Sequence, residues 1–392
     1  MRIEAVDFFY LAMPEVRDIG DGSQDMLLVR LRAGDHTGWG ECEASPLTSI
    51  ASLVCPMSHS ACKPVRDSVL GQRLDAVADI ARIGKVVREN SLDLLQAAHT
   101  LSGIEIAMWD LLGRRFETPV HELLGQSPAH PKVAYASALF GDTPQQTYDK
   151  ARAVVAAGYR AAKFGWGPYG RGSVAADADQ VHAARDGLGA DRLLLVDAGT
   201  VWGDDLDAAA QRLPALAESG VGWLEEPFVS GALDAYRRLA AVGSVPLAAG
   251  EGAHDPYLAC HLVDHGGLGF VQIDTGRIGG IGPAVQVSEY ARDRGVQFVN
   301  HTFTSHLALA ASLQPFAGWP EAALCEYPVE ASDLATALTD VHLIPDADGR
   351  ISLPAGPGLG VTPRPDAVQR YLLDVEIRVG GRLLYETPDL TA

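Results

Sequence analysis

The sequence predicts an α/β protein whose larger part is a closed barrel of alternating strands and helices. From Lys132 onward, eight short apolar stretches alternate with seven helix-like stretches. Such alternation is typical of a closed barrel or of an open doubly wound sheet. No Gly-x-Gly-x-x-Gly turn follows the first strand, which weakens the case for a dinucleotide-binding sheet. The strand candidates are 132–140, 159–165, 192–197, 221–225, 245–250, 268–274, 296–300 and 322–326.

Three successive strand candidates end in a carboxylate, namely Asp197, Glu225 and Glu251, which are 28 and 26 residues apart. This spacing is about the length of one strand–helix unit, and a barrel collects the ends of all its strands at one mouth. The acids therefore favour the barrel over the open sheet. Like charges so close together repel unless a cation lies between them. A single acid after a strand is usually a helix cap, but three at matched spacing predict an oxygen-ligand site for Mg²⁺.

The overall composition limits the possible partners. The chain has 392 residues, enough for two domains, and a formal charge of −19 with a sequence pI near 4.9. This acidity argues against nucleic acid or an anionic membrane as a partner. The N-terminus has no secretory pattern and no apolar run could span a bilayer, so we expect a cytoplasmic protein. Cys55 and Cys62 are close enough in sequence to form a local bridge, but free thiols are the preferred interpretation.

The N-terminal region reads as a separate unit. Residues 1–45 predict antiparallel strands, with Gly34 and Gly38 supplying a turn. Residues 46–70 show no clear period and are predicted to be loop. Helical patterning continues to about residue 125, and the stretch 101–113 is apolar nearly all round, which predicts a buried helix with Asp110 as a structural acid. The alternation over 375–379 predicts a late strand that returns to the N-terminal domain.

Residues with side chains suited to acid, base or binding roles also lie at the ends of other predicted strands. Lys163 lies at the end of strand two, Asp274 ends strand six, His301 follows strand seven and Glu326 ends strand eight. His301 and Asp274 would lie on adjacent strands, so a hydrogen-bonded His–Asp dyad is geometrically natural. Such an acid fixes the imidazole tautomer and raises its basicity.

The combined pattern resembles the mandelate racemase/muconate lactonizing enzyme branch of the enolase superfamily. The resemblance rests on the acids of Val196-Asp197, Trp223-Leu224-Glu225-Glu226-Pro227 and Gly250-Glu251, on the run from Gln272 to Ile281, and on His301. It covers nearly the whole chain. The Glu-Glu-Pro and Asp-x-Gly-Arg-x-Gly-Gly elements are specific in combination and weak alone.

The resemblance implies a (β/α)7β TIM-like barrel with an α+β capping domain built from the N-terminal part and the C-terminal tail. It implies Mg²⁺ on Asp197, Glu225 and Glu251, an acid/base dyad of His301 and Asp274, and a hydrogen bond from Glu326 to an enediolate. Glu226 would then lie behind the metal ligands. The expected domains are 1–126 for the capping domain, 127–355 for the barrel and 356–392 for a C-terminal segment that packs back on the cap.

The sequence departs from the family at strand two. Many relatives carry Lys-x-Lys there, with the second Lys as a base, whereas this chain has Lys163 and Gly165. A racemase needs a base on each face of the α carbon, but a dehydratase can use one His to take the α proton and then protonate the departing β hydroxyl. The missing Lys therefore favours elimination of water. Lys163 is expected to bind the substrate carboxylate or to lower a nearby pKa, or to act as a base if the strand end is shifted.

These observations predict an acid-sugar dehydratase that acts on an aldonate or aldarate and gives a 2-keto-3-deoxy acid. A racemase or epimerase on the same scaffold is the alternative, and a non-catalytic homologue is a third hypothesis. Tyr169, His254, Arg277 and Asn300 are further candidates for contacts with the substrate. The partner is expected to be a small-molecule carboxylate and the protein a homo-oligomer. The capping-domain loops at 15–25 and 45–65 should select the sugar, which the sequence does not identify.

Overall fold

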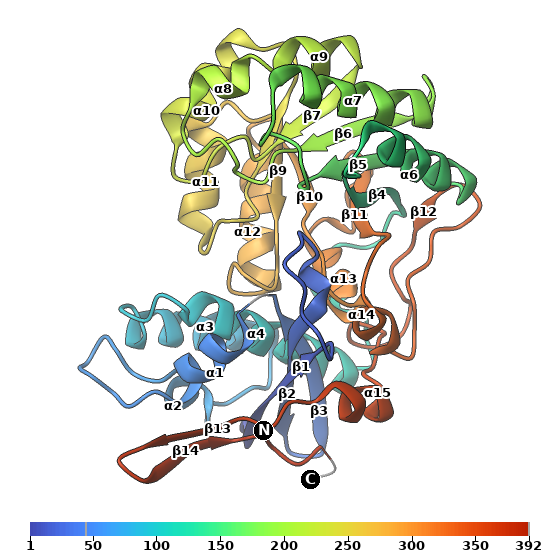
Figure 1. Cartoon of the computed structure of the whole chain (residues 1–392). Coiled ribbons are helices and arrows are strands. Elements are labelled where there is room, and N and C mark those ends of the chain that lie inside the picture. The colour runs from blue at the N-terminus through green and yellow to red at the C-terminus, as the bar shows by residue number, and fades with distance from the viewer. Residues whose placement is uncertain (44, 391–392) are drawn as a thin grey trace.

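The computed structural model describes residues 1–43 and 45–390 of the chain, so the last two residues of the expected C-terminal segment lie outside the described part. Figure 1 shows a capping domain at the bottom, built from N-terminal segments and the C-terminal tail, and a barrel domain at the top. Among the described helices, none combines the length and the apolar character that a membrane crossing requires.

Three antiparallel strands form the sheet of the capping domain. They are β1 (Ala5–Ala12), β2 (Asp25–Ala33) and β3 (His36–Cys42), in the order β1-β2-β3. The turn between β2 and β3 contains Gly34 at a φ of 57°, a left-handed conformation that glycine adopts without a steric penalty. The predicted antiparallel strands are confirmed and Gly34 lies in the turn as expected, but Gly38 lies within β3, where it pairs with Leu31.

Helices cover one side of this sheet. They are α1 (Pro46–Val54), α2 (Val65–Val69), α3 (Val77–Asn90), α4 (Ala97–Arg115) and α5 (Val120–Leu123). The prediction of loop over 46–70 was wrong at α1 and α2. The Ser-rich sequence of α1 has weak intrinsic helix propensity, but Pro46 starts the helix and Ile50, Leu53 and Val54 are buried. Tertiary packing therefore supplies the stability that local sequence does not show.

The long helix α4 lies very close to β3. A Cβ atom added to Gly40 would lie 2.1 Å from the carbonyl oxygen of Gly103, so only glycine permits this approach. Asp110 of α4 is fully buried, and its carboxylate accepts hydrogen bonds from the backbone N–H groups of Trp39 and Leu359. The prediction that Asp110 is a structural acid is confirmed.

Eight parallel strands form the nearly closed barrel, in the order β10-β9-β8-β7-β6-β5-β4-β11. The predicted α/β barrel is confirmed. The strands are β4 (Lys132–Leu139), β5 (Ala161–Gly165), β6 (Leu193–Asp197), β7 (Val221–Glu225), β8 (Leu247–Ala249), β9 (Phe270–Ile273), β10 (Gln297–Asn300) and β11 (Leu324–Pro328). The helices between them are α6 (Pro144–Ala156), α7 (Val174–Leu188), α8 (Leu206–Ala210), α9 (Leu213–Glu218), α10 (Leu233–Val242), α11 (Pro256–His265), α12 (Ile281–Arg292) and α13 (His306–Ser312).

The seam between β10 and β11 is joined by a side chain. Oδ1 of Asn300 accepts a hydrogen bond from the backbone N–H of Glu326 at 3.0 Å. The amide group of Asn300 also donates to the hydroxyl oxygens of Thr302 and Ser312, both at 3.1 Å. Asn300 was predicted to contact substrate, but the structure buries it away from the cavity, where its amide links the ends of the last two barrel strands.

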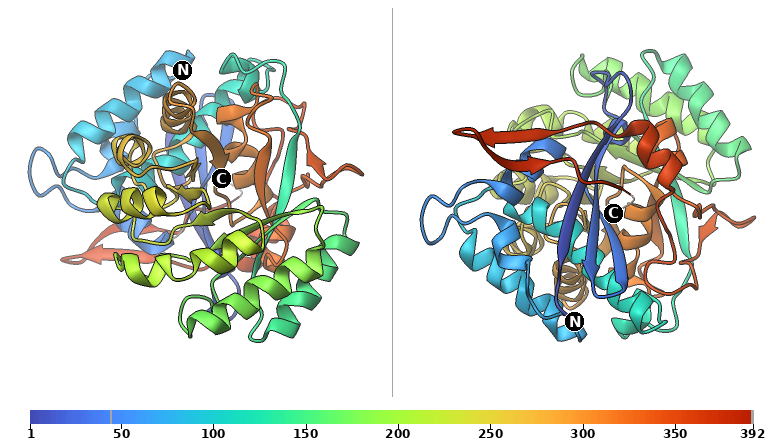
Figure 2. Two further views of the ribbon diagram at one scale, coloured as in Figure 1. Left: turned by 90° about the horizontal axis from the view of Figure 1, so that it is seen from above. Right: turned by 90° about the horizontal axis from the view of Figure 1, so that it is seen from below.

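The chain ends on the capping domain. The last elements are α14 (Asp333–Ala337), β12 (Arg350–Ile351), α15 (Pro365–Tyr371), β13 (Glu376–Val379) and β14 (Arg382–Glu386), and the short 3-10 helices are η1 (Gly22–Gln24) and η2 (Gln314–Phe316). Strand β13 pairs with β14 in a hairpin, which crosses the N-terminal sheet when seen from below (Figure 2). Leu373 donates a backbone hydrogen bond to Tyr10, and the Tyr385 hydroxyl donates to the carbonyl oxygen of Phe8. The predicted return of the tail to the N-terminal domain is confirmed, although 375–379 pairs with the tail itself.

Candidate active site

The three acids predicted from the strand rhythm lie at one mouth of the barrel. Asp197 and Glu225 are the last residues of β6 and β7 and are paired in the register of these strands, and Glu251 lies two residues after β8. Asp197 and Glu225 are buried, and the Glu251 side chain is 15% exposed. Parallel strand order thus brings the carboxylates of three successive units to one rim.

The ammonium group of Lys163, from β5, lies among the acids. Its Nζ atom is 2.5 Å from Oε1 of Glu225, 2.8 Å from Oε1 of Glu326 and 3.4 Å from Oδ2 of Asp197. Burial acts to lower the pKa of Lys163, but these carboxylates overcome it and hold the pKa well above its ordinary value. Burial of Glu225 outweighs the attraction of this one lysine and raises the pKa of Glu225 to about 8.

The second cation at the rim is Arg277, which lies after β9. Its Nη1 atom donates to Oε1 of Glu251 at 3.2 Å, and its Nη2 atom donates to Oε1 of Glu43 at 2.8 Å. Burial acts to raise the pKa of Glu251, but His301, Arg277 and Lys163 overcome it and lower the pKa to about 2. Arg277, proposed from sequence as a contact to substrate, thus lies in the site and joins the acidic rim to the capping domain.

His301 and Asp274 form the predicted dyad. Nδ1 of His301 lies 2.7 Å from Oδ2 of Asp274, whose other oxygen accepts a 2.6 Å hydrogen bond from the backbone N–H of Gly276. Nε2 of His301 lies 3.3 Å from Oε2 of Glu251 and 3.9 Å from Oε2 of Glu326. Burial acts to lower the pKa of His301, but Glu251 and Glu326 overcome it and raise the pKa to about 10.

Glu326 is held at the floor of the site, where its side chain is fully buried. Its Oε2 atom accepts a hydrogen bond from the backbone N–H of Thr302 at 3.0 Å, and its Oε1 atom contacts Lys163. The carboxyl group of Glu226, next to Glu225, is also buried and crowded by other acids. Burial, together with the charges of Glu251 and Asp197, holds the pKa of Glu226 well above its ordinary value.

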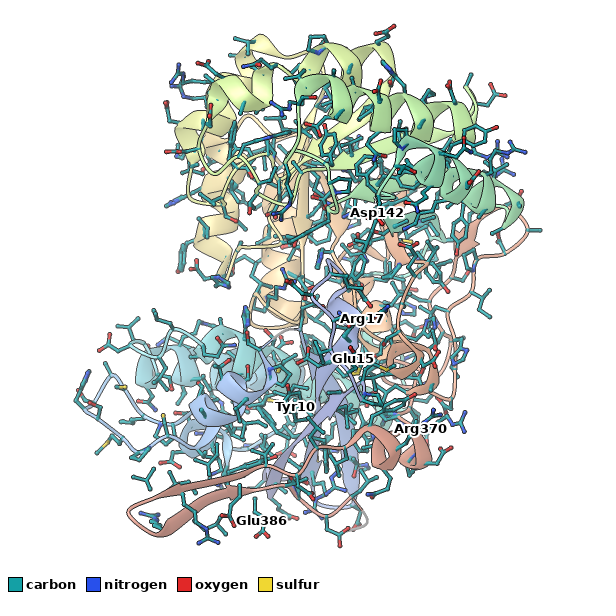
Figure 3. All side chains as sticks on the ribbon, in the orientation of Figure 1. Tyr10, Glu15, Arg17, Asp142, Arg370 and Glu386 are labelled. Atoms are coloured by element: carbon teal, nitrogen blue, oxygen red, sulfur yellow. The ribbon has the colours of Figure 1, made fainter. Side chains whose placement is uncertain are left out.

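Several of these groups line a cavity of about 230 Å³ between the barrel and the capping domain. Its charged or titratable lining residues are Asp21, Glu43, Lys163, Asp197, Glu251, Arg277 and His301, and its large apolar ones are Ile19, Leu139, Trp166 and Phe303. The segment between β1 and β2 reaches this mouth: Glu15 and Arg17 on it lie below Asp142, which follows β4 (Figure 3). The sequence analysis did not identify Glu43 and Asp21 as site residues, because neither ends a barrel strand. For Glu43, the available signal was its position as a second acid two residues after Glu41.

Gly165, which stands where the expected Lys-x-Lys pattern has its second lysine, packs closely against Asp197. A Cβ atom added to Gly165 would lie 2.7 Å from Cβ of Asp197 and 3.0 Å from its carboxyl carbon. A side chain at 165 would therefore displace Asp197, one of the rim acids. Trp166, which follows in a left-handed conformation at a φ of 57°, lies beside the cavity instead.

Two other candidates lie away from the cavity. Tyr169, which was predicted to contact substrate, follows the turn after β5 into a buried aromatic cluster, where its ring stacks on Phe140 at 4.9 Å between centroids. His254 is not among the lining residues either. Its Nδ1 atom lies 3.1 Å from Nε2 of His99, so it contributes to the contact between barrel and cap.

The donor atoms at the rim fit a hard divalent cation. Asp197, Glu225 and Glu251 offer only oxygen, the charge of Glu251 raises the pKa of the other two, and Asp197 and Glu225 already draw in the ammonium group of Lys163. Donor atoms of Glu43, Asp274 and His301 also lie within 4.8 Å of one another. In that second group, Glu43 already pairs with the cation Arg277, and His301 is bound to Asp274. The rim of Asp197, Glu225 and Glu251 is therefore the better metal site.

Known proteins share both domains of this chain. Residues 146–367 match the family model for the enolase C-terminal domain-like fold, and residues 18–125 match the N-terminal domain of mandelate racemase/muconate lactonizing enzyme. The crystal structure of a predicted mandelate racemase from Rhodobacter sphaeroides is 60% identical, with a TM-score of 0.95, over 99% of this chain and 100% of that chain.

Two relatives that are named for a reaction share less sequence identity with this chain. D-galactarolactone cycloisomerase of Agrobacterium fabrum is 29% identical over 88% of this chain and 90% of its own length. D-galactonate dehydratase of Xanthomonas oryzae pv. oryzae is 29% identical over 69% and 72%. On the two family models, the fold and the site, the chain belongs to the mandelate racemase/muconate lactonizing enzyme branch of the enolase superfamily.

Proposed function

We propose that this protein is a Mg²⁺-dependent dehydratase that removes water from an acid sugar and releases a 2-keto-3-deoxy acid. One observation carries the proposal: the cavity has a His–Asp dyad on one side and Gly165 where a second base would stand. A single base suits elimination, in which the proton taken from carbon 2 can be returned to the leaving group.

Asp197, Glu225 and Glu251 would hold the Mg²⁺ ion. When bound, the ion would neutralise the negative charge that gathers on the substrate carboxylate as the α proton leaves. Enolase-superfamily sites are known to pair a Lys or His base with Mg²⁺ in this way. Lys163, surrounded by three carboxylates, is held as an ammonium ion and would add a fixed positive charge beside the same carboxylate.

His301 would move the proton. Its Nε2 atom takes the proton from carbon 2, and the electron pair of the C–H bond passes toward the carboxylate, giving an enediolate. The electrons then return to form a double bond between carbons 2 and 3 while the C3–O bond breaks. His301 gives its proton to the departing hydroxyl, which leaves as water, and the resulting enol becomes the 2-keto acid. Asp274, bonded to Nδ1, keeps Nε2 directed at the cavity throughout.

A racemase or epimerase is the alternative, and the position of Lys163 favours it to a limited degree. Lys163 lies on β5, where related enzymes carry a base, and it lines the cavity. Acids raise the pKa of both candidate bases, but they hold the pKa of Lys163 well above its ordinary 10.5, whereas that of His301 rises to about 10. A cation on Glu251 would also offset one of the two charges that raise the pKa of His301, so His301 would lose its proton more readily than Lys163. The proposed dehydration does not require Lys163 to lose its proton.

The test is a screen of the purified protein with Mg²⁺ against monocarboxylic and dicarboxylic acid sugars, assayed for 2-keto acids. A sugar lactone and an anhydro sugar acid belong in the panel because cycloisomerases occur among the relatives. Parallel reactions in D₂O report exchange of the α proton. A keto acid product supports the proposal, deuterium in recovered substrate without keto acid supports the alternative, and the absence of both contradicts each of them.

A further inference from the structure

The cavity has two chemically different walls. The barrel wall carries the rim acids together with Lys163, which suits a carboxylate bound through a metal ion. The facing wall belongs to the capping domain and carries two acids, Asp21 and Glu43. The reacting end of a substrate would lie at the first wall, so the rest of its chain would meet the second.

Glu43 is fixed in that wall. It is only 4% exposed, its Oε1 atom accepts from Nη2 of Arg277, and its backbone N–H donates to the carbonyl oxygen of Gly276 at 3.2 Å. A Cβ atom added to Gly276 would lie 2.7 Å from the backbone nitrogen of Glu43, so the end of β3 rests directly on the loop after β9. The backbone of Glu43 is therefore held against the barrel, and its carboxylate could move away from a ligand only by giving up the ion pair with Arg277.

Asp21 adds a second acid to the same wall. Its Oδ1 atom accepts hydrogen bonds from the backbone N–H and the hydroxyl of Ser23, at 2.8 and 2.6 Å. These local bonds hold the side chain at the start of η1, where it is nearly buried and lines the cavity. Both acids thus present fixed acceptors toward the cavity.

The positively charged or protonatable side chains of the cavity already pair with carboxylates. Among the described lining residues, the positive or protonatable side chains are Lys163, Arg277 and His301. Lys163 contacts three carboxylates, Arg277 joins Glu43 to Glu251, and His301 is bound to Asp274. A second carboxylate on the substrate would meet two acids and no uncommitted cation within the described part of this wall.

We propose that Asp21 and Glu43 are specificity residues that select aldonates and reject aldarates, with Glu43 accepting a hydrogen bond from a hydroxyl of the sugar chain. This inference rests on the proposed dehydration and names its substrate class. Hydroxyl groups can donate to fixed carboxylates, whereas a distal carboxylate placed against them suffers like-charge repulsion and loses its hydration without a partner. In specificity of this kind, repulsion of the wrong substrate contributes as well as attraction of the right one.

Matched pairs of substrates test the selection in turnover. With Mg²⁺, each six-carbon aldonate is compared with the aldarate of the same hydroxyl configuration, for example D-gluconate with D-glucarate and D-galactonate with galactarate. We expect kcat/KM for the best aldonate to exceed that of its aldarate by about tenfold or more, which corresponds to about 1.4 kcal/mol. Equal or faster turnover of the aldarate overturns the inference and leaves the dehydration intact.

Variants test whether Asp21 and Glu43, the two acids of the capping-domain wall, cause the preference for aldonates. Glu43→Gln removes the charge while its amide oxygen can still accept from Nη2 of Arg277, so the preference for the aldonate should fall about tenfold through better use of the aldarate. Asp21→Asn, which can still accept from Ser23, should shift the preference in the same direction. Asp142→Asn removes an exposed acid outside the cavity and should leave the preference unchanged. An equal shift in Asp142→Asn assigns the preference to overall charge and overturns the inference.

Binding separates this inference from the proposed reaction. Calorimetry with the His301→Asn variant and Mg²⁺ measures the affinity for each acid without turnover. We expect the aldonate to bind about tenfold more tightly or better. Equal or tighter binding of the aldarate, or binding of neither acid, overturns the inference. If wild-type turnover fails but binding is seen, the proposed dehydration is contradicted. The measured affinities then decide whether the site prefers aldonates to aldarates.

Discussion

Nδ1 of His301 lies 2.7 Å from Oδ2 of Asp274, and this contact directs Nε2 of the same imidazole into the cavity. The loop after β9 supports the arrangement, because Oδ1 of Asp274 is held by the backbone N–H of Gly276. Both oxygens of Asp274 are thereby fixed. The two residues come from adjacent strands, β9 and β10, so the geometry depends on the barrel and not on local sequence.

Asp274→Asn is expected to lower kcat by about 10²- to 10⁴-fold, because an amide can hold Nδ1 in the wrong tautomer and cannot stabilise the protonated imidazole. Steady-state kinetics at saturating substrate and Mg²⁺ measure the effect. Asp264→Asn, which removes a partly exposed acid bonded to Tyr290 and Arg294, serves as the control and should keep kcat near the wild-type value. A similar small loss in both variants would rule out the orienting role of Asp274.

The charge of His301 should make the stability of the metal-free protein depend on pH. The pKa of His301 is raised to about 10 in the folded protein, against an ordinary value of 6.5. Its stabilising contribution is therefore complete below about pH 6.5 and is lost as the pH rises from there to about 10. Denaturant unfolding of wild type and His301→Asn in EDTA measures this, and the difference in unfolding free energy should shrink over that range. A difference that stays flat or grows would contradict the assignment.

Much of the barrel could be predicted from the sequence because its signals are periodic. Each strand–helix unit repeats, and each rim acid follows an apolar run, so Asp197, Glu225 and Glu251 could be placed by counting. Parallel order then puts them at one mouth without any knowledge of side-chain packing. The dyad followed from the same rule, since His301 and Asp274 end neighbouring strands.

The remaining site residues depend on contacts that no spacing reveals. Tyr169 and Trp166 lie in one turn, and the left-handed backbone at Trp166 decides which of them lies at the cavity. Asn300 resembles a ligand in sequence, yet it closes the seam between β10 and β11. Glu43 lies on the capping domain, so its place beside Arg277 depends on how two separate units dock.

Lys163→Met is expected to destabilise the metal-free protein by about 3–5 kcal/mol, because it leaves buried carboxylates without their cation. Mg²⁺ should restore much of this loss, since the ion would supply the missing charge at Glu225. Lys132→Met provides a matched control: Lys132 is also buried, and it donates to the carbonyl oxygen of Trp319 without a carboxylate partner. Thermal unfolding with and without Mg²⁺ compares them, and an equal effect of Mg²⁺ on both variants would contradict the placement of the metal at the rim.

Glu105→Ala is expected to lower the free energy of unfolding by about 3 kcal/mol, because it leaves buried donors unsatisfied. The carboxylate of Glu105, on α4 of the cap, accepts from the backbone N–H groups of Ile281 and Gly282 at the start of α12. It thereby joins the two domains. Glu89→Ala removes an exposed ion pair with Lys85 and should cost about 0.5 kcal/mol or less. Chemical denaturation of both variants measures the difference, and equal losses would show that the Glu105 contact does not stabilise the domain interface.

Elimination of water by a single His–Asp base is the central claim, and one comparison tests it most directly. Wild type and His301→Asn are incubated with the acid-sugar panel, each with Mg²⁺ and with EDTA, and 2-keto acid is measured against time. The account predicts keto acid from wild type with Mg²⁺, and none above background from the variant or from either protein in EDTA. Keto acid formation that persists in His301→Asn or in EDTA, or α-proton exchange by wild type without any keto acid, would contradict it.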